Sequence, residues 1–166
     1  MLYLLDANIS ITAHGNYYPI DQVPEFWDWL QYQGEQGSVK IPLEIMDEIR
    51  QGRDEDPLVE WIETPEVLKA LLLKEDLDPA LVRRTVDTYA PDLTDSELLQ
   101  IGSDPFLIAY ALAAPADRCV VTIETSRPKA QRQNRKVPDV CRDLGVQSCG
   151  PFQLNRDLGF STRWKR

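Results

Sequence analysis

Three short apolar segments constrain the fold of this chain more than any other feature. Leu2–Leu5, Val39–Ile41 and Cys119–Ile123 are each too short for a helix and are typical of buried strands. A weaker fourth strand is predicted near Val146. Segments with helical signals separate them, and strands that alternate with helices indicate a parallel sheet. The sequence therefore predicts an α/β domain with a mainly parallel central sheet.

Helix signals fill the segments between the predicted strands. The segment 104–112 begins with Asp104-Pro105 and is apolar on nearly every face, as expected for a deeply buried helix. Thr94–Glu97 fits a capping box, and proline follows a capping residue at the starts near residues 64 and 78. The other predicted helical segments are 24–33, 42–52, 64–89 and a short helix that ends near Gly145.

Length and composition fit one globular domain. The 166 residues are 43% hydrophobic and 27% charged, as in an ordinary globular protein. We assign residues 1–150 to the α/β domain and residues 151–166 to a C-terminal extension, with Trp164 as its anchor. No apolar run is long enough to cross a bilayer, and the N-terminus lacks the features of a signal peptide. We therefore expect a cytoplasmic protein that does not associate with membranes.

The cysteines and the histidine exclude several kinds of site. Cys119, Cys141 and Cys149 cannot all pair within the chain and lack the spacing of zinc ligands, so we expect reduced thiols. His14 is the only histidine, which leaves little room for a Ser-His-Asp triad and excludes a two-histidine zinc motif. Neither a P-loop nor a dinucleotide-binding fingerprint is present.

Four carboxylates are expected to meet at one edge of the sheet. Ligands of open parallel sheets bind outside the carboxyl ends of the strands. Asp6 follows the first strand and Glu48 lies in the helix after the second. Asp104 begins the buried helix and Glu124 follows the third strand, with no neighbouring cation expected to neutralise the group. Clustered carboxylates are costly unless a hard cation binds them, so this set predicts a site for Mg²⁺ or Mn²⁺.

Each acid also has a purely structural explanation. Asp6 and Asp104 could cap the helices that follow them. Glu48 could be a solvated helix acid, and Glu124 could be an ordinary polar residue after a strand. The argument for a site therefore depends on the joint placement of the four carboxylates.

In four blocks the sequence resembles the PIN-domain ribonucleases. The blocks are Leu4-Leu5-Asp6-Ala7-Asn8, Glu48–Gly52, Asp104–Ala111 and Val120–Glu124, in this order along the chain. The resemblance covers residues 1–150 and implies a three-layer α/β/α nuclease domain that hydrolyses RNA phosphodiester bonds with Mg²⁺ or Mn²⁺. It implies that the catalytic and metal-binding residues are Asp6, Glu48, Asp104 and Glu124, with Asn8 and Thr122 as hydrogen-bonding supports. At the position of Glu124 the family more often has aspartate.

The resemblance also implies partners. Many single-domain members are toxins of toxin–antitoxin pairs and form homodimers, so the expected partners are an RNA substrate, an antitoxin protein and a second copy of the chain. Although the net charge is −9, residues 127–136 form a positive segment that contains no acid. Its cations are predicted to bind RNA phosphates; the alternative is a solvated loop. These cations are Arg127, Lys129, Arg132, Arg135 and Lys136.

Three other functions are alternatives to a nuclease. A haloacid-dehalogenase-like phosphatase needs a second aspartate where this chain has Asn8, and a phospho-receiver domain needs an early acidic pair. A PIN-like scaffold that binds RNA or protein without cutting remains the main rival, and DNA remains an alternative substrate. Trp27, Trp29 and Trp61 could stack on bases, but their helical spacing beside leucines favours the core.

Overall fold

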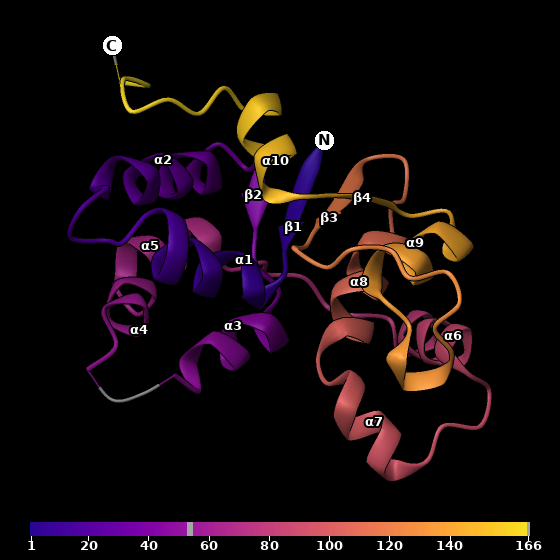
Figure 1. The fold of residues 1–166 in the computed structure, drawn as a ribbon. Coiled ribbons are helices and arrows are strands. Elements are labelled where there is room, and N and C mark those ends of the chain that lie inside the picture. Colours follow the sequence, from indigo (N-terminus) through magenta and orange to yellow (C-terminus); the bar gives the residue numbers. More distant parts are fainter. Residues whose placement is uncertain (53–54, 166) are drawn as a thin grey trace.

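The computed structural model describes residues 1–52 and 55–165 and contains a four-stranded sheet in the order β2-β1-β3-β4 (Figure 1). All three strand pairings are parallel, as predicted. The strands are β1 (Leu2–Leu5), β2 (Val39–Lys40), β3 (Arg118–Val121) and β4 (Gln147–Cys149). Residue 166, the last of the predicted extension, lies outside the described residues.

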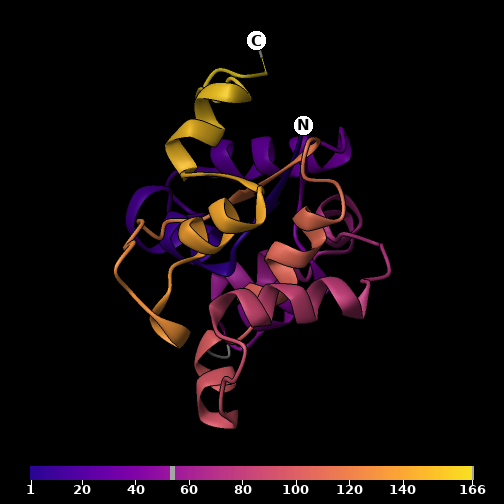
Figure 2. The same ribbon diagram turned by 90° about the vertical axis from the view of Figure 1, so that its right-hand side faces the viewer.

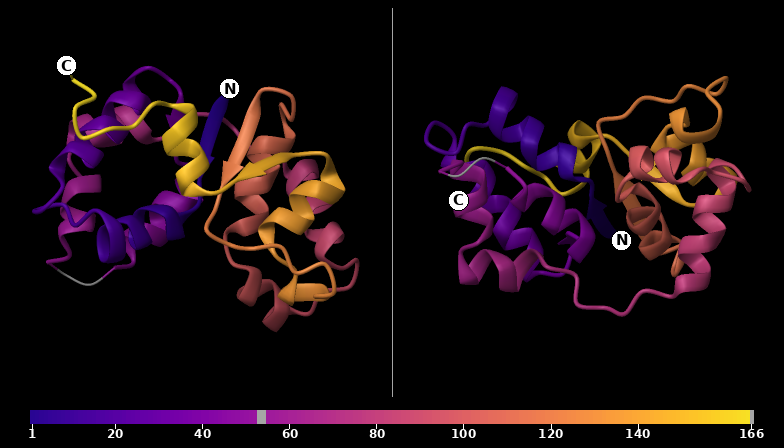
Figure 3. Two further views of the ribbon diagram at one scale, coloured as in Figure 1. Left: turned by 45° about the horizontal axis from the view of Figure 1, so that its top comes forward. Right: turned by 90° about the horizontal axis from the view of Figure 1, so that it is seen from below.

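Helices cover both faces of the sheet and give the expected three-layer α/β/α fold. The group α2, α4 and α5 lies on one side of the strands, and α6, α8 and α9 lie on the other (Figures 1 and 3). The helices are α1 (Ala7–Thr12), α2 (Pro24–Glu35), α3 (Leu43–Arg50), α4 (Pro57–Ile62), α5 (Pro65–Leu71), α6 (Pro79–Tyr89), α7 (Asp95–Ile101), α8 (Asp104–Leu112), α9 (Val137–Leu144) and α10 (Pro151–Asp157). A π-helix, η1 (Ala13–Tyr17), extends α1, and a 3₁₀-helix, η2 (Arg132–Asn134), precedes α9.

The central strands are apolar because both of their faces are covered. Leu4, Leu5, Val120 and Val121 have no exposed surface, and β1 pairs with β3 along its whole length. Helix α8 packs on both strands, which explains why it is apolar all round. The carboxyl ends of β1 and β3 therefore lie side by side, with a fixed register.

The predicted helical segment 64–89 is two helices, α5 and α6, with residues 72–78 between them. Helix α5 ends at Leu71, and Leu72 has an extended backbone. Its neighbours then bond to Ile41: the Ile41 amide donates to Leu71 O (2.7 Å), and the Leu73 amide donates to Ile41 O (2.9 Å). Residues beyond α5 thus extend the outer edge of β2, an interaction that periodicity along the sequence does not report.

The tryptophans of the N-terminal half belong to the core, as predicted. Trp27 and Trp29 are each 1% exposed, and Trp61 packs edge-on against Trp27 with ring centroids 4.7 Å apart. The rings of Trp27 and Trp29 are therefore not available to stack on nucleic-acid bases, whereas Trp61 is only partly buried.

The C-terminal residues 151–165 pack against the α/β domain. Leu154 of α10 is buried, and Asn155 Nδ2 donates to Tyr18 Oη (3.3 Å). The expected anchor Trp164 donates from Nε1 to Glu25 O (3.0 Å), so the chain end lies along α2 (Figure 3). None of the helices in the described ranges is long and apolar enough to cross a membrane.

Candidate functional site

A polar pocket of about 630 Å³ lies at the carboxyl ends of β1 and β3. The four predicted acids reach it from four separate parts of the chain. Helix α7 and the turn before α8 form one wall, and α7 projects away from the sheet beside it (Figure 2). The lining residues are Asp6, Asn8, Glu48, Gln51, Leu99, Gln100, Ile101, Gly102, Ser103, Asp104 and Glu124.

Asp6 is the most firmly held of these acids. It continues β1, since its amide donates to Val121 O (2.9 Å). Its side chain is buried and makes no capping bond to α1. Instead Oδ2 accepts hydrogen bonds from Asn8 Nδ2 (2.6 Å) and Thr122 Oγ1 (2.7 Å). The structure therefore brings the two predicted supports to this carboxylate and gives no support to the capping alternative.

Asn8 and Thr122 also join the ends of the two central strands. Asn8 Oδ1 accepts from the Ile123 amide (3.2 Å), and Asn8 Nδ2 lies 3.3 Å from Thr122 Oγ1. Thr122 Oγ1 accepts from the Glu124 amide (3.2 Å). This network fixes the position of the Asp6 carboxylate relative to the loop that carries Glu124.

Asp104 lies within the first turn of α8, whose N-cap is Ser103, so it is not the capping residue. Burial, together with the charges of Asp6, Glu124 and Glu48, raises the pKa of its carboxyl to about 8. At neutral pH this carboxyl therefore holds a proton for most of the time.

Glu48 and Asp6 are affected in the same way. Burial, and then the charge of Asp6, raises the pKa of Glu48, although a hydrogen bond from Ser103 opposes the shift. Burial also raises the pKa of Asp6, against the hydrogen bonds from Thr122 and Asn8. Burial and the charges of neighbouring carboxylates thus destabilise the charged form of all three acids.

Glu124 is held differently, and here the expectation that no cation neutralises the acids is wrong. Glu124 Oε1 accepts from Lys136 Nζ (3.0 Å), and Oε2 accepts from the Val137 amide at the start of α9 (2.8 Å). Lys136 follows Glu124 by twelve residues and returns to it only through the fold. Both carboxylate oxygens are therefore engaged at the edge of the pocket.

The four acids share the pocket without forming a ready-made metal site. Within residues 1–52 and 55–165, no three side chains of His, Cys, Asp or Glu are grouped closely enough to hold one metal ion together. Repulsion between carboxylates and the bonds that hold Glu124 to α9 both favour such separation. The arrangement can nevertheless offer two carboxylates and several waters to a hard cation, which is the usual set for Mg²⁺.

The positive segment 127–136 is divided by the structure. Arg132 pairs with Asp92 (2.7 Å) and Glu97 (2.7 Å) near the start of α7. Arg135 pairs with Asp143 and bonds Thr88 O, and Lys136 pairs with Glu124. Only Arg127 and Lys129 are exposed without an ion pair to the described part of the chain. Most of the predicted RNA-binding cations therefore fasten this segment to its neighbours.

Asp139, a further acid near this segment, has a structural role. It is 1% exposed and accepts from Ser126 Oγ (2.5 Å) and the Arg127 amide (2.7 Å). Arg142 Nη1 bonds the same carboxylate at 3.1 Å. Asp139 therefore fixes the loop between β3 and the positive segment.

Sequence reasoning missed Tyr89, the last residue of α6. Its side chain is 4% exposed, and its hydroxyl has no hydrogen-bond partner among the described residues. Burial raises the pKa of this hydroxyl, and the next largest contributions come from Asp104 and Glu124. An unpartnered buried hydroxyl next to the acids is a donor that a ligand or an ordered water can satisfy. No signal in the sequence distinguishes it from an ordinary core tyrosine.

Comparisons with known proteins identify the family of the chain. A family model described as "Domain of unknown function (DUF4411)" matches residues 3–162. No curated protein and no solved structure matches the chain. The match spans every element of the candidate pocket.

Proposed function

The chain belongs to the DUF4411 family, and we propose that it is a metal-dependent endoribonuclease that hydrolyses RNA phosphodiester bonds. The observation that carries the proposal is the convergence of Asp6, Glu48, Asp104 and Glu124 on one polar pocket at the carboxyl ends of the central strands. The resemblance of the blocks that contain these acids to PIN-domain ribonucleases supports it.

The residues of the pocket fit a hard divalent cation. Carboxylate oxygens are the preferred ligands of Mg²⁺ and Mn²⁺, and Mg²⁺ usually takes only one or two of them with waters and a substrate phosphate. Asp6 and Asp104 would be the principal ligands, with Glu48 at the more exposed side. Tyr89 adds an unpartnered hydroxyl close to Asp104. Glu124 would act from the edge, since its oxygens are already bonded.

The other residues of the site position groups. Asn8 and Thr122 hold the Asp6 carboxylate by donating to its Oδ2. Lys136, paired with Glu124, places a positive charge at the edge of the pocket, where it would attract a phosphate. A bound Mg²⁺ or Mn²⁺ would lower the pKa of a coordinated water and stabilise the charge that develops on the phosphoryl oxygens.

We also propose a cellular location and protein partners for the enzyme. The three free thiols suit a reducing compartment, so we place the protein in the cytoplasm. An antitoxin protein and a second copy of the chain are the proposed protein partners. A non-catalytic scaffold that binds RNA or protein is the rival function, and it does not account for a pocket in which the pKa of Asp6, Glu48 and Asp104 is raised by desolvation and by neighbouring carboxylates.

Titration of the protein with Mn²⁺ by calorimetry tests the proposal without any assumption about the RNA. We expect saturable binding to the wild type and at least about tenfold weaker binding to Asp6→Asn and to Asp104→Asn, because loss of an outer-sphere partner alone costs 10–100-fold. Asp47→Asn is the matched control, since Asp47 lies on the same helix as Glu48 but pairs with Arg50 outside the pocket.

Circular dichroism would confirm that each variant keeps its fold. Mn²⁺ binding that is equal in the wild type and both pocket variants would overturn the proposed site. An absence of saturable binding in the wild type would favour the non-catalytic scaffold.

A further inference from the structure

A second hollow, of about 510 Å³, lies beside the acidic pocket at the carboxyl end of β4. We call it the aromatic groove and define it by six of its lining residues. Part of the lining, which we call the apolar wall, is apolar, and another part carries hydroxyl groups. The apolar wall consists of Tyr17, Ile123 and Phe152, and the hydroxyl groups belong to Thr125, Ser126 and Ser148.

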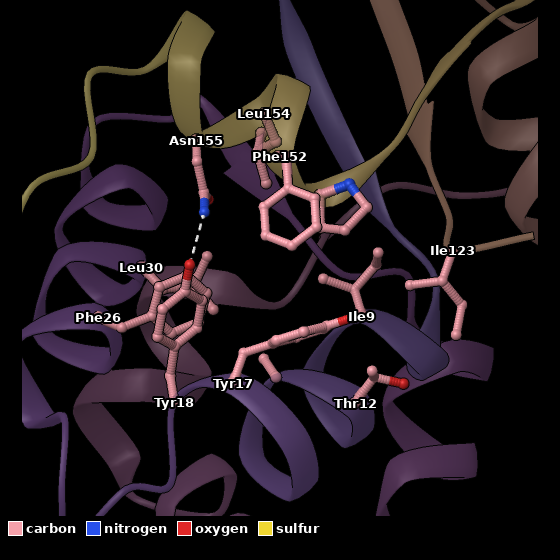
Figure 4. Close-up of a pocket in the computed structure, with 12 residues that line it drawn as sticks. Ile9, Thr12, Tyr17, Tyr18, Phe26, Leu30, Ile123, Phe152, Leu154 and Asn155 are labelled. Carbon is pink, nitrogen blue, oxygen red and sulfur yellow. Dashed lines mark hydrogen bonds between the residues drawn. The ribbon is translucent and has the colours of Figure 1, made fainter.

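The apolar wall is unusually exposed for side chains of this kind. Tyr17 and Phe152 are each 49% exposed, and Ile123 is 41% exposed. The two rings meet edge to face, with centroids 5.4 Å apart and planes at 71°. Figure 4 draws an adjacent hollow between η1 and α10, which shares Tyr17, Ile123 and Phe152 with the aromatic groove and shows how these three side chains lie. Ring surface is thus left open to solvent on a rigid support.

A π-helix places Tyr17 at the surface. Residues Ala13–Tyr17 form a π-helix, and the Tyr18 amide closes it by donating to Ala13 O (2.6 Å). The next ring, Tyr18, turns inward and stacks on Phe26 at 4.3 Å. Tyr17 therefore faces the surface, and Tyr18 packs toward the core. Turns of π-helix occur frequently at functional sites.

The aromatic groove is continuous with the acidic pocket. Glu124 lines both hollows, and Thr122, which donates to Asp6, lines the groove. Beyond Ser126 the same loop continues into Arg127 and Lys129, the two cations of the positive segment that are exposed without ion pairs to described residues. A strand whose phosphate lies at the acids would thus meet rings and hydroxyl groups on one side and positive charge beyond them.

We propose that the aromatic groove binds the bases of single-stranded RNA next to the bond that is cut, with base faces on Tyr17 and Phe152. This inference rests on the proposed nuclease function and adds the substrate class. Aromatic side chains stack on bases of any sequence. Bases inside an A-form duplex have no free faces, whereas those of single strands do.

Hydroxyl groups in the lining of the groove favour this occupant over a second copy of the chain. Thr125, Ser126 and Ser148 can exchange hydrogen bonds with base edges, and Thr125 and Ser126 are exposed. The core of a homodimer interface is more apolar than a typical protein surface. Association of two copies through this groove is therefore treated as the competing outcome of the test.

The test measures binding of two fluorescent strands of roughly 12 nucleotides, with EDTA present so that nothing is cut. One is ordinary single-stranded RNA, and the other is an abasic strand with the same phosphates but no bases. We expect Tyr17→Ala combined with Phe152→Ala to bind the ordinary strand about 5- to 150-fold more weakly, the range for one lost stacked base. Affinity for the abasic strand should be unchanged.

Two controls separate stacking from other effects. The ring-preserving exchange of Tyr17→Phe with Phe152→Tyr should bind both strands like the wild type. Tyr32→Ala removes another exposed ring, which packs on Trp164 away from the pocket, and should also have no effect. If the double variant fails to fold, the single variants Tyr17→Ala and Phe152→Ala decide, since each removes only one half-exposed ring.

The inference is wrong if the alanine variants bind the ordinary strand like the wild type, or if they lose affinity for both strands equally. Unchanged RNA binding with a dimer that dissociates in the variants would assign the groove to a second copy of the chain. RNA cleavage, measured separately with Mn²⁺, keeps the two proposals apart. Base-dependent binding without cleavage by the wild type would support the aromatic groove and contradict the nuclease. Cleavage together with normal RNA binding by the alanine variants would support the nuclease and contradict the groove.

Discussion

Asp104 illustrates how the pocket alters a single carboxyl group. Its pKa rises to about 8 because it is buried and faces Asp6, Glu124 and Glu48. The folded protein therefore keeps a proton that the unfolded chain, with an ordinary pKa of 3.8, has already released at neutral pH. By linkage, the stabilising contribution of this proton is complete below about pH 4 and is lost as the pH rises through about 8.

This linkage gives a prediction for stability. In EDTA, the melting temperature of the wild type should fall between about pH 5 and about pH 8 relative to Asp104→Asn, which cannot titrate at this position. At the upper pH the variant should be the more stable protein, although it binds metal poorly. Melting curves followed by circular dichroism over this range would check it, with Asp47→Asn as the control.

Parallel pH dependences for the wild type and Asp104→Asn would show that this carboxyl does not retain its proton in the folded protein. The predicted combination, a variant that is more stable and less able to bind metal, is the behaviour of a residue kept for function at a cost in stability.

At the level of elements, the positive segment 127–136 combines two roles that composition cannot separate. Arg132 is tied to Asp92 and Glu97, which holds the segment against α7. Replacing Arg132 with glutamate would therefore place like charges together as well as remove a cation. Variants of Arg132 or Arg135 would therefore not report on RNA binding alone, and Arg127 and Lys129 are the better test.

We predict that Arg127→Gln combined with Lys129→Gln weakens RNA binding and makes it less dependent on salt. The slope of log K against log salt should become shallower by about 1.4, because each phosphate contact to a single strand contributes about 0.7. Fluorescence anisotropy at several salt concentrations measures this slope. Arg83→Gln with Arg84→Gln, on the exposed side of α6, is the matched control; an equal slope in wild type and the loop variant would show that the two cations do not contact phosphates.

The elements were predictable from the sequence where local patterns determine them. The strand Leu2–Leu5 and the capping box at Thr94 appear where they were predicted, because apolar runs and caps act within a few residues. The helix starts near residues 64 and 78 are where they were predicted, but the end of α5 was not predicted, since Leu72 leaves the helix to pair with Ile41, thirty-one residues earlier. Local propensity cannot report a contact of that range.

The site was predictable in a similar way, residue by residue. Asp6 could be placed because the ends of parallel strands share one edge of a sheet, and its supports Asn8 and Thr122 were expected from the resemblance to PIN-domain ribonucleases. The partner of Glu124 could not, since Lys136 reaches it only after the chain has looped back to α9. Tyr89 could not be predicted for the same reason, because its position relative to the acids depends on how α6 packs against α8.

In the whole molecule, one edge of the sheet gathers everything that the proposed reaction needs. The carboxyl ends of β1 and β3 present the acids, and the carboxyl end of β4 leads into the aromatic groove. The negative charge of the chain as a whole therefore does not conflict with RNA as a substrate, because the exposed cations of the loop lie beside this edge and a metal would neutralise the acids.

Cleavage of end-labelled single-stranded RNA in the presence of Mn²⁺ tests the central claim most directly. We predict discrete products with the wild type and with Asp47→Asn, no products in EDTA, and rates at least about 100-fold lower for Asp6→Asn and Asp104→Asn, because a metal supplies several kcal/mol of transition-state stabilisation. Cleavage that persists in EDTA, or at an equal rate in both pocket variants, would contradict metal-dependent hydrolysis at these carboxylates.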